Sequence, residues 1–552
     1  MSDSDQSRLR ELREEIVAFV HALHHPVLAE AGGQSFDLTE MGWRLEVEFG
    51  KLLLELWGQG RSTVRRVEQA EPDGDRLRVL ARKSRGAEPV VLEIREYGQR
   101  EEPRSDAADE NQDGEAALGR THDRQLFERE LLALLAREFP GFSLEGVSHR
   151  SDRAHSFSAC YSRGWARRGG EAWAFLGLSE LEGPAAAENA LAYALIWLDW
   201  LRQRSERTLT RGLKLILPPQ AVAVAAHRAA YLDASVAQVE ILEWAPGARA
   251  LGQIDLRDYG NVETRLSERR RGSRLIERLR PFVLDLLGEA SDRVKVVPEA
   301  SGEALSLRVL GLEVARVEGP VAARACFGLE GERRLLDEET RAEFSSLLAS
   351  VLELRRAGSP DRSHRFYSLQ PERWLESLLV DDIARVDTAF LPEYVYPQVP
   401  AFSGPASPAL SRGVIDILGV TRDRASSACR LAVVELKLDE DVNLPLQGLD
   451  YWLRVKWLED RDQFRPFGYF PGLDPSPALP VLYLVSPAFR FHSTTERILR
   501  YFRPDIRVVK VGLNQRWREG VQVLFRRVLE QGRAPDEPIE AAPGTALQNA
   551  PS

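Results

Sequence analysis

Residues 413–451 read GVIDILGVTRDRASSACRLAVVELKLDEDVNLPLQGLDY. The stretch contains two short runs, VIDIL and LAVVELKL, that are rich in Val, Ile and Leu and too short for a buried helix, so each predicts a buried strand. Asp416 interrupts the first run, and Glu435 and Lys437 interrupt the second. An unpaired buried charge is strongly unfavourable or is lost through a pKa shift. The three residues together therefore indicate a metal site with a catalytic base or a charge stabiliser.

The spacing of these residues allows them to converge. Glu435 and Lys437 are two positions apart on one strand, so their side chains leave the same face. The short connection from Asp423 to Cys429 predicts a hairpin that brings the strand of Asp416 alongside. Two carboxylates, with water and phosphate oxygens, form a ligand set that Mg²⁺ prefers. Such a metal can stabilise the charge of phosphoryl displacement, and a neighbouring lysine can orient or deprotonate the attacking water.

The Glu-x-Lys triplet has a simpler alternative interpretation. Glutamate and lysine are common on protein surfaces, so the triplet can also mark an edge strand with two solvated charges. Here an apolar Leu-Ala-Val-Val run precedes it, and only seven of the 74 basic residues in the chain are lysines. In a chain with so many arginines, a lysine at this position is unlikely to be there by chance. We therefore favour the metal site.

The pattern Asp…Glu-x-Lys followed by Gln-x-x-x-Tyr resembles the PD-(D/E)xK nuclease superfamily, which has the restriction-endonuclease-like fold, in its RecB-type QxxxY variant. The string IDILGV…LAVVELK…QGLDY is also similar to the catalytic core of mismatch-specific endonucleases of the EndoMS/NucS type. The resemblance implies that Asp416 and Glu435 bind Mg²⁺ or Mn²⁺, with the carbonyl of Leu436 as a further ligand. It implies that Lys437 is the catalytic lysine.

The resemblance also implies roles for residues outside the two strands. Gln447 and Tyr451 lie on the following helix and would organise the site or touch the substrate backbone. Members of the superfamily often place a glutamate on the helix before the first core strand, and Glu376 matches this role, although Glu372 and Glu393 also lie close to it. Ile415 departs from the family pattern because many members have a proline there. The loop between the two strands is also longer than a tight hairpin.

The elements around the motif predict an α/β domain over residues 366–533. Their order is αββαβαβ, which suits a mixed sheet with helices on both faces. The expected elements are a helix at 371–386, strands at 414–418 and 431–438, a helix from about 443, a strand at 479–485, a helix at 494–502 and a strand at 506–511.

The same order of elements recurs in residues 121–250. The expected elements are a helix at 123–139, strands at 156–161 and 172–178, a helix at 188–202, a strand at 213–217, a helix at 222–232 and a strand at 239–244. In this alignment Ser158-Ala159-Cys160 falls near the position of Asp416, and Gly177-Leu178-Ser179 falls at Glu435-Leu436-Lys437. We predict a degenerate, inactive nuclease-like copy, which would form a pseudo-dimer within the chain. One alternative is that residues 121–250 form an unrelated α/β domain. The alternative to a pseudo-dimer within the chain is a homodimer of two chains.

The remaining segments have weaker patterns. Alternating strand patterns predict smaller β-rich modules, and an acidic run with Gly, Pro and Asn predicts disorder. The predicted organisation is an N-terminal β-rich module at 1–100, an acidic disordered linker at 101–120, the α/β domain at 121–250, an α+β connecting module at 251–365, the nuclease domain at 366–533 and a disordered tail at 534–552.

Whole-chain properties exclude several classes of protein. The chain has 552 residues, 43% of them hydrophobic and 29% charged, which is typical of a multidomain soluble protein. No apolar run is long enough to span a membrane, and the N-terminus has no signal-peptide pattern, so we expect a cytoplasmic protein. Its three cysteines are far apart and predict neither a zinc site nor disulfides. No P-loop motif is present, so no ATPase activity is expected.

The net charge of −10 disfavours nucleic-acid binding, but the distribution of charge matters more. The segment Phe489 to Arg533 contains eleven basic and four acidic residues, with Tyr501, Phe502 and Trp517 interleaved. Basic groups can neutralise phosphates and aromatic rings can stack on bases. The candidate nucleic-acid-binding residues are Arg497, Arg500, Arg503, Arg507, Lys510, Arg516 and Arg518. A second basic cluster is Arg265 to Arg280, and the alternative for both is a solvated helix face.

Together these patterns predict a Mg²⁺-dependent phosphodiesterase, a nuclease of the repair or defence type. An endonuclease is favoured over an exonuclease, and DNA is favoured over RNA as the substrate. One alternative is a catalytically silent nuclease-fold protein that binds nucleic acid or acts as a scaffold. Another is a structural or regulatory protein in which the buried charges form a salt-bridge network.

Overall fold

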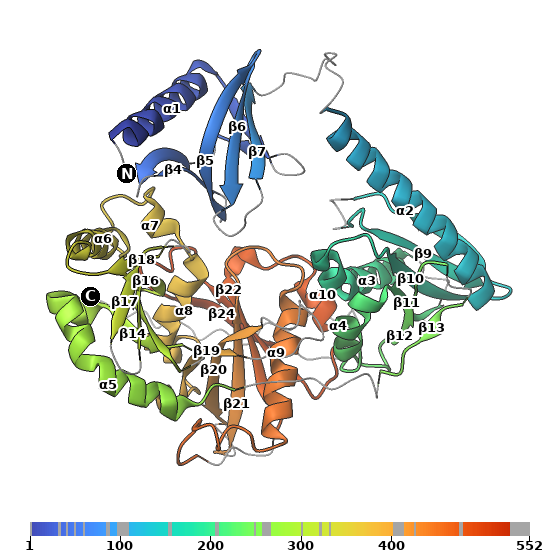
Figure 1. Cartoon of the computed structure of the whole chain (residues 1–552). Helices are drawn as coiled ribbons and strands as arrows, with labels where there is room; N and C mark the ends of the chain where they lie inside the picture. Colours follow the sequence, from blue (N-terminus) through green and yellow to red (C-terminus); the bar gives the residue numbers. More distant parts are fainter. Residues whose placement is uncertain are drawn as a thin grey trace, which may run out of the picture.

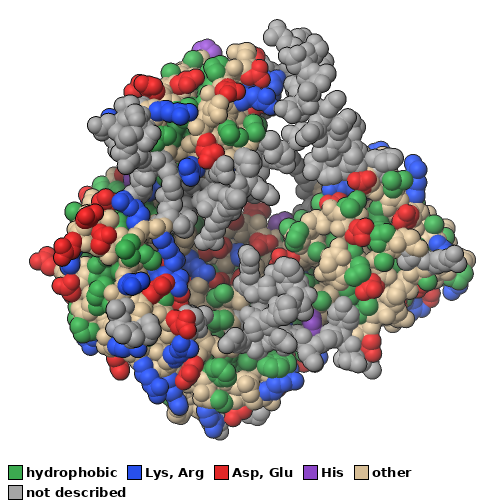
Figure 2. Space-filling view, viewed as in Figure 1, with side chains coloured by type: hydrophobic (Ala, Val, Ile, Leu, Met, Phe, Trp, Pro, Cys, Tyr) green, Lys and Arg blue, Asp and Glu red, His purple; other side chains and the backbone are tan. Residues whose placement is uncertain are grey.

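The structure is a computed structural model, in which four β-sheets organise the chain (Figure 1). It describes residues 3–30, 35–39, 42–48, 51–58, 61–83, 89–96, 110–152, 157–204, 209–247, 250–256, 266–299, 302–319, 323–329, 333–400, 413–423, 427–473 and 478–529. Within these ranges, no helix is both long enough and apolar enough to cross a membrane. Figure 2 shows a hollow in the middle of this face of the molecule, with acidic side chains visible inside it.

The N-terminal module is a seven-stranded antiparallel sheet with one helix packed against it. Ile16 and Val20 on that helix are buried together with Leu45 and Leu52 of the sheet, so the helix covers the apolar face. The elements are α1 (Asp3–Ala22), β1 (Pro26–Glu30), β2 (Ser35–Asp37), β3 (Gly42–Glu48), β4 (Lys51–Gly58), β5 (Arg61–Asp73), β6 (Arg76–Lys83) and β7 (Pro89–Glu96).

The second domain is built on a six-stranded mixed sheet in the order β13-β12-β11-β10-β9-β8. Strands β10, β11 and β12 are parallel, and helices α3 and α4 form the two crossovers between them. The elements are α2 (Glu110–Glu138), β8 (Ser143–Ser148), β9 (Tyr161–Arg168), β10 (Glu171–Leu178), α3 (Pro184–Arg204), β11 (Leu209–Leu217), α4 (Pro219–Ala229), β12 (Gln238–Glu243) and β13 (Gly252–Gln253).

Two predictions for this domain are wrong. Helix α2 already begins at Glu110, inside the segment 101–120 that was predicted to be a disordered linker. Residues 101–109 lie outside the described residues. The strand predicted at 156–161 lies instead at 161–168, where the guanidinium of the buried Arg163 stacks 4.5 Å from the ring centre of Phe157.

The connecting module is a five-stranded antiparallel sheet flanked by helices. Arg355 joins it to the next domain, because its buried guanidinium donates to the carbonyls of Phe366 and Leu369 and stacks over Trp374. The elements are α5 (Arg269–Leu287), η2 (Gly288–Arg293), β14 (Lys295–Pro298), β15 (Ala304–Val309), β16 (Leu312–Glu318), β17 (Arg324–Phe327), β18 (Arg334–Leu336), α6 (Arg341–Leu354) and α7 (Arg365–Ser368).

The C-terminal domain has a six-stranded mixed sheet in the order β19-β20-β21-β22-β23-β24. Strands β21, β22 and β23 are parallel and are connected through α9 and α10. The elements are α8 (Pro371–Asp381), η3 (Ile383–Arg385), η4 (Pro392–Tyr394), β19 (Tyr396–Pro400), β20 (Val414–Arg422), β21 (Cys429–Leu436), α9 (Leu444–Glu459), β22 (Val481–Pro487), η6 (Ala488–Arg490), α10 (Thr495–Leu499), β23 (Arg507–Leu513) and β24 (Val523–Leu529). The two edge strands were not predicted, and the predicted tail at 534–552 lies outside the described residues.

The second and the C-terminal domains share one sheet plan. In each sheet the first two strand pairs are antiparallel, the next two are parallel, and the last is antiparallel. In each sheet a helix forms each crossover between the parallel strands. This shared connectivity is what a duplication requires, and the common origin of the two domains stays a prediction.

The strand register corrects the predicted alignment of the two domains at one position. Gly177 pairs with Ser162 across β10 and β9. Ile417 pairs with Val434 across β20 and β21, and one further step of that register sets Asp416 opposite Glu435. Ser162, rather than Ser158-Ala159-Cys160, therefore stands where Asp416 stands in the C-terminal domain, because β9 begins later than predicted.

Candidate active site

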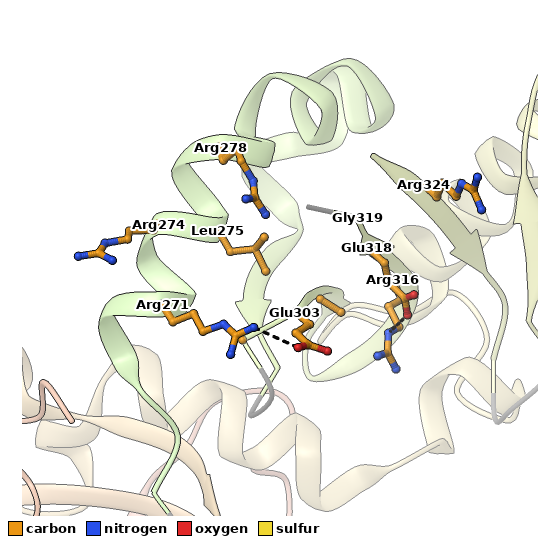
Figure 3. A pocket seen from close by; sticks show the side chains of 11 residues that line it. Arg271, Arg274, Leu275, Arg278, Glu303, Arg316, Glu318, Gly319 and Arg324 are labelled. Carbon is orange, nitrogen blue, oxygen red and sulfur yellow. Dashed lines mark hydrogen bonds and ion pairs between the residues drawn. The ribbon is translucent and has the colours of Figure 1, made fainter. Parts of the chain in front are cut away.

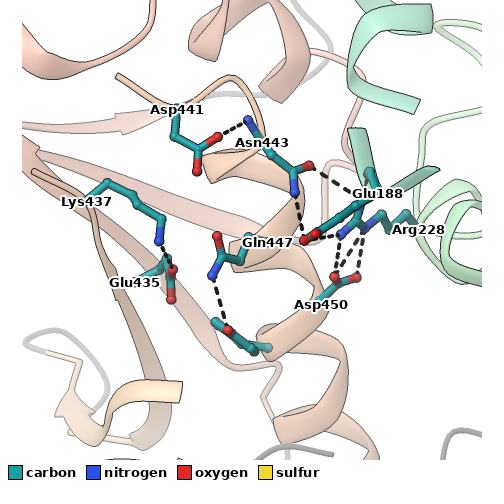
Figure 4. Close-up of polar contacts among 9 residues, drawn as sticks. Glu188, Arg228, Glu435, Lys437, Asp441, Asn443, Gln447 and Asp450 are labelled. Carbon is teal, nitrogen blue, oxygen red and sulfur yellow. Dashed lines mark hydrogen bonds and ion pairs between the residues drawn. The ribbon is translucent and has the colours of Figure 1, made fainter. Parts of the chain in front are cut away.

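Asp416, Glu435 and Lys437 lie together at one end of β20 and β21. The backbone N–H of Leu436 donates to Oδ2 of Asp416 at 2.9 Å, which ties the aspartate to the neighbouring strand. The Lys437 Nζ lies 3.6 Å from Oε1 of Glu435, as the dashed line in Figure 4 indicates. Glu435 is only 1% exposed. The hairpin thus brings two carboxylates and one amine into a single cluster, in which Glu435 is buried and Asp416 and Lys437 are half-buried.

The cluster strongly perturbs the acidity of its members. Burial raises the pKa of Glu435 well above its ordinary value, and the charge of Asp416 raises it further. Burial also raises the pKa of Asp416, although the hydrogen bond from the Leu436 N–H opposes the shift. Burial alone would lower the pKa of Lys437, but the charges of Glu435, Glu372 and Asp416 outweigh it and raise that pKa above its ordinary value. The site therefore holds more negative charge than its own lysine balances.

The residues present fit a divalent cation. Oε2 of Glu435 is buried and accepts no hydrogen bond from any described residue, so one lone-pair-bearing oxygen is left for another partner. Asp416 and Glu435, with the carbonyl of Leu436, are the groups that would hold the ion. Over the described ranges, no set of three or more His, Cys, Asp and Glu side chains is arranged to bind a metal. Water and substrate oxygens would thus complete the coordination shell, as Mg²⁺ commonly requires.

Two glutamates of α8 border this cluster. Glu376 is buried, accepts a 2.8 Å hydrogen bond from Arg373 and also accepts one from Gln398 of β19. Burial raises the pKa of Glu376 to about 7. Glu372 lies one turn earlier, and its Oε1 accepts the backbone N–H of Leu438 at 3.4 Å. Glu376 was the predicted residue and Glu372 its neighbouring alternative. Glutamates four positions apart share one face of a helix, so both can border the same site.

Gln447 and Tyr451 lie on α9, which packs on β21 and β22. The Gln447 Nε2 donates to the Tyr451 hydroxyl at 3.2 Å. Burial, followed by the charge of Glu435, raises the pKa of Tyr451, so the tyrosine is within electrostatic reach of the cluster. The predicted pair therefore borders the carboxylates and keeps its hydroxyl protonated.

The second domain also reaches the site, which the sequence analysis missed. Asn443, which precedes α9, donates from Nδ2 to Oε1 of Glu188 at 3.3 Å. Arg228 of α4 forms a buried ion pair with Asp450 of α9 at 2.7 Å. Figure 4 shows Gln447 on α9 between this polar group and the Glu435–Lys437 pair. Burial raises the pKa of Glu188, and the charge of Arg228 opposes the shift most. Charges of the C-terminal domain also act on this carboxyl, with Asp450 raising its pKa further, so the two domains are coupled electrostatically.

The seven basic residues proposed to bind nucleic acid do not form one free surface. Arg497 lies 3.7 Å from Asp199 of the second domain, and burial raises the pKa of Asp199 while Arg497 and then Arg500 oppose that shift. Arg503 stacks over Tyr231 of the same domain. These three arginines therefore face the contact between domains and contribute to it.

The other four candidates differ from one another. The Lys510 Nζ pairs with Glu496 at 2.9 Å, and Arg518 stacks over the rings of Trp374 and Trp517. Arg507 and Arg516 are exposed. The interleaved aromatic residues Tyr501, Phe502 and Trp517 are at most 3% exposed. The expectation that these rings stack on bases is wrong, because they pack in the core.

The second basic cluster borders a groove of about 880 Å³ in the connecting module. Figure 3 shows Arg271 and Arg278 on α5 pointing toward the strands, with Arg316 and Arg324 on the opposite side. Arg271 pairs with Glu303 at 3.0 Å, and Arg316 pairs with Glu299 at 2.8 Å. The groove therefore combines guanidinium groups with acidic partners, and arginines of this kind can bind phosphate oxygens.

The raised pKa of Glu376 predicts a pH-dependent stability in the absence of metal. The folded protein holds the Glu376 proton up to pH about 7, whereas the unfolded chain releases it near the ordinary value of 4.5. The resulting stability is fully present below that ordinary value and is lost as the pH rises through about 7, by about 3 kcal/mol. Urea unfolding in EDTA at pH 4.5 and pH 8 measures the loss. The same loss in Glu376→Gln would contradict the assignment to this carboxyl.

Comparison with known proteins does not assign the chain to a family. The chain matches no family model, no curated protein and no solved structure. Its chemistry must therefore be inferred from its own geometry. The carboxylates of Asp416 and Glu435 lie on adjacent strands with Lys437 just after the second strand, and the glutamates of α8 and the polar residues of α9 border them.

Proposed function

We propose that the chain is a metal-dependent nuclease that hydrolyses phosphodiester bonds in DNA, with a restriction-endonuclease-like C-terminal domain. The observation that carries the proposal is the Glu435 carboxylate, buried beside Asp416 and Lys437 with Oε2 free of hydrogen bonds from the described residues. Burying such a group destabilises the fold unless a proton or a cation neutralises it. A bound divalent cation removes that cost and supplies the chemistry of phosphoryl transfer.

In the proposed mechanism, Asp416, Glu435 and the Leu436 carbonyl are the groups that would hold Mg²⁺ or Mn²⁺, and the ion would supply charge stabilisation at the scissile phosphate. Lys437 keeps its proton at neutral pH because its pKa is raised. It therefore donates hydrogen bonds to the attacking water or to the phosphate. Glu376, with a pKa of about 7, is the group of the site best matched to proton exchange near neutral pH.

DNA is the proposed substrate because the motif resembles DNA-cutting members of the superfamily. Positive charge for its phosphates is available in the arginine-lined groove of the connecting module and at the exposed Arg507 and Arg516. The alternative, a silent nuclease-fold binding or scaffold protein, differs in one respect: it needs no cation at the carboxylates.

We expect the purified full chain to cut DNA with Mg²⁺ or Mn²⁺ and to leave it intact in EDTA. Single-stranded and double-stranded DNA and RNA are compared in one gel assay. Lys437→Met should lower the rate by on the order of 100-fold, because it removes the charge beside the phosphate. Lys456→Met is the matched control, since Lys456 pairs only with Asp460 on the surface of α9 among the described residues.

Three results of this assay would distinguish the functions. Metal-dependent cutting that Lys437→Met lacks and Lys456→Met retains supports the nuclease. Binding of DNA without cutting in any metal would replace it with the silent binding protein. If the chain neither bound nor cut DNA, the structural role would be the remaining interpretation.

A further inference from the structure

The contact between the second and the C-terminal domains has the form of a two-fold interface. Helix α3 of one packs on α10 of the other, and α4 packs on α9, so corresponding helices exchange partners. Leu232 forms an antiparallel bridge with Phe502, and each residue lies three positions after the corresponding helix, α4 or α10. In a two-fold interface, if position i of one half contacts position j of the other half, then position j of the first half also contacts position i of the second. The bridge therefore lies where the axis would pass.

The hydrogen bonds around this bridge show the same exchange. The N–H of Asp233 donates to the carbonyl of Tyr501 at 2.7 Å, and the N–H of Arg503 donates to the carbonyl of Tyr231 at 3.1 Å. Buried residues of both domains also form one continuous apolar core. The two domains are thus held together as an internal dimer rather than as separate modules on a linker.

The two halves of this internal dimer differ at the position of the active site. Gly177 stands where Glu435 stands, because both precede the last residue of the corresponding strand, β10 or β21. A Cβ atom on Gly177 would lie 2.6 Å from Leu131 Cδ2 and 3.2 Å from Phe127 Cζ. The space in which a carboxylate would stand is therefore filled by apolar side chains.

The residues that fill this space come from the helix that corresponds to α8. Phe127 and Leu131 lie one turn apart on α2, as Glu372 and Glu376 do on α8, and each helix precedes the first strand of its sheet. Phe127 and Leu131 belong to a buried cluster that also contains Phe175 of β10. The C-terminal domain thus has the carboxylates of Asp416 and Glu435 at this position, where the second domain has the apolar side chains of Phe127 and Leu131.

We propose that the chain cuts one strand of a DNA duplex and leaves the other intact, an inference that rests on the proposed nuclease function. A two-fold protein on duplex DNA places its two halves on the two antiparallel strands. At the open site, water forms a bond to phosphorus and the bond to one sugar oxygen breaks, which gives a phosphate monoester and a hydroxyl group. The sealed domain holds the opposite strand without cutting it.

Supercoiled plasmid DNA incubated with the full chain and Mg²⁺ or Mn²⁺ tests the proposal, with the protein below the DNA concentration. Nicked circles should accumulate until nearly all supercoiled DNA is consumed, and linear DNA should appear only after many independent nicks. Linear DNA as the first product would overturn the inference and leave the nuclease function in place.

A Mn²⁺ titration tests the number of open sites separately from cleavage. A chain that cuts no DNA would refute the proposed nuclease function, and the titration would still show whether it has one open site or two. One open site predicts that Glu435→Gln removes the tight Mn²⁺ binding of the chain. Tight binding that survives in Glu435→Gln would reveal a second site and overturn the inference.

Discussion

Replacement of Glu435 by glutamine is expected to abolish cleavage and to stabilise the metal-free protein. Glutamine has the same shape but cannot supply the charged ligand, so the rate should fall by on the order of 1000-fold. The pKa of Glu435 is raised well above 4.5, so the folded site disfavours the charge even with Lys437 nearby. A neutral amide removes that penalty, and we expect a gain of about 1 kcal/mol or more at pH 8.

The size of this stability change depends on pH, which provides an internal check. Near pH 4.5 the buried carboxyl of Glu435 is already protonated, so glutamine should bring almost no gain. Urea unfolding in EDTA at pH 4.5 and pH 8, together with cleavage rates in Mg²⁺ and Mn²⁺, measures both effects.

Glu459 offers a matched control on the same domain. It lies at the end of α9, and burial raises its pKa to about 7. Glu459→Gln should therefore also gain stability at pH 8, but it should cut DNA at the rate of the unmodified chain. A Glu435→Gln protein that still cuts, or that is less stable than the unmodified chain at pH 8, would contradict the assignment of Glu435 as a metal ligand.

The core of the candidate site could be predicted because it is local. Asp416, Glu435 and Lys437 lie on two strands joined by a short connection, so alternation along each strand determines which side chains share a face. Glu188 and Arg228 could not be predicted in this way. They come from another domain, and no pattern in their own helices indicates the contact with Asn443 and Asp450.

The sequences of β19, β24 and β9 also explain why these strands were not predicted or were predicted at the wrong position. Strand β19 contains two prolines, which are confined to the edges of sheets, and its sequence therefore reads as a connection. Strand β24 is largely exposed and contains two arginines, so it has no apolar face to reveal it. Strand β9 was predicted at the wrong position because the buried Arg163 interrupts its apolar pattern. The guanidinium of Arg163 stacks on the rings of Phe157 and Trp197. Apolar periodicity therefore detects buried central strands, but it fails for edge strands and for strands that contain a buried charge.

Replacement of Arg228 by methionine is expected to lower the free energy of unfolding by about 3 to 5 kcal/mol, because it leaves Asp450 buried without its ionic partner. Both charges are almost completely buried, and the guanidinium donates three hydrogen bonds to the carboxylate, at 2.7, 3.1 and 3.2 Å. The double variant Arg228→Met with Asp450→Leu should recover most of the loss, since it removes both charges together. Urea unfolding of the four proteins gives the coupling energy.

The same substitution should loosen the contact between the two domains and disturb the active site. Arg228 also donates to the Glu188 carbonyl and to Oδ1 of Asn443, next to the start of α9, which carries Gln447. We expect faster hydrogen exchange at the amides of Asp233 and Arg503, which bond across the interface, and slower cleavage in Arg228→Met. If stability, exchange and cleavage were all unchanged, this ion pair would not hold the domains together, and the open site would not depend on its sealed neighbour.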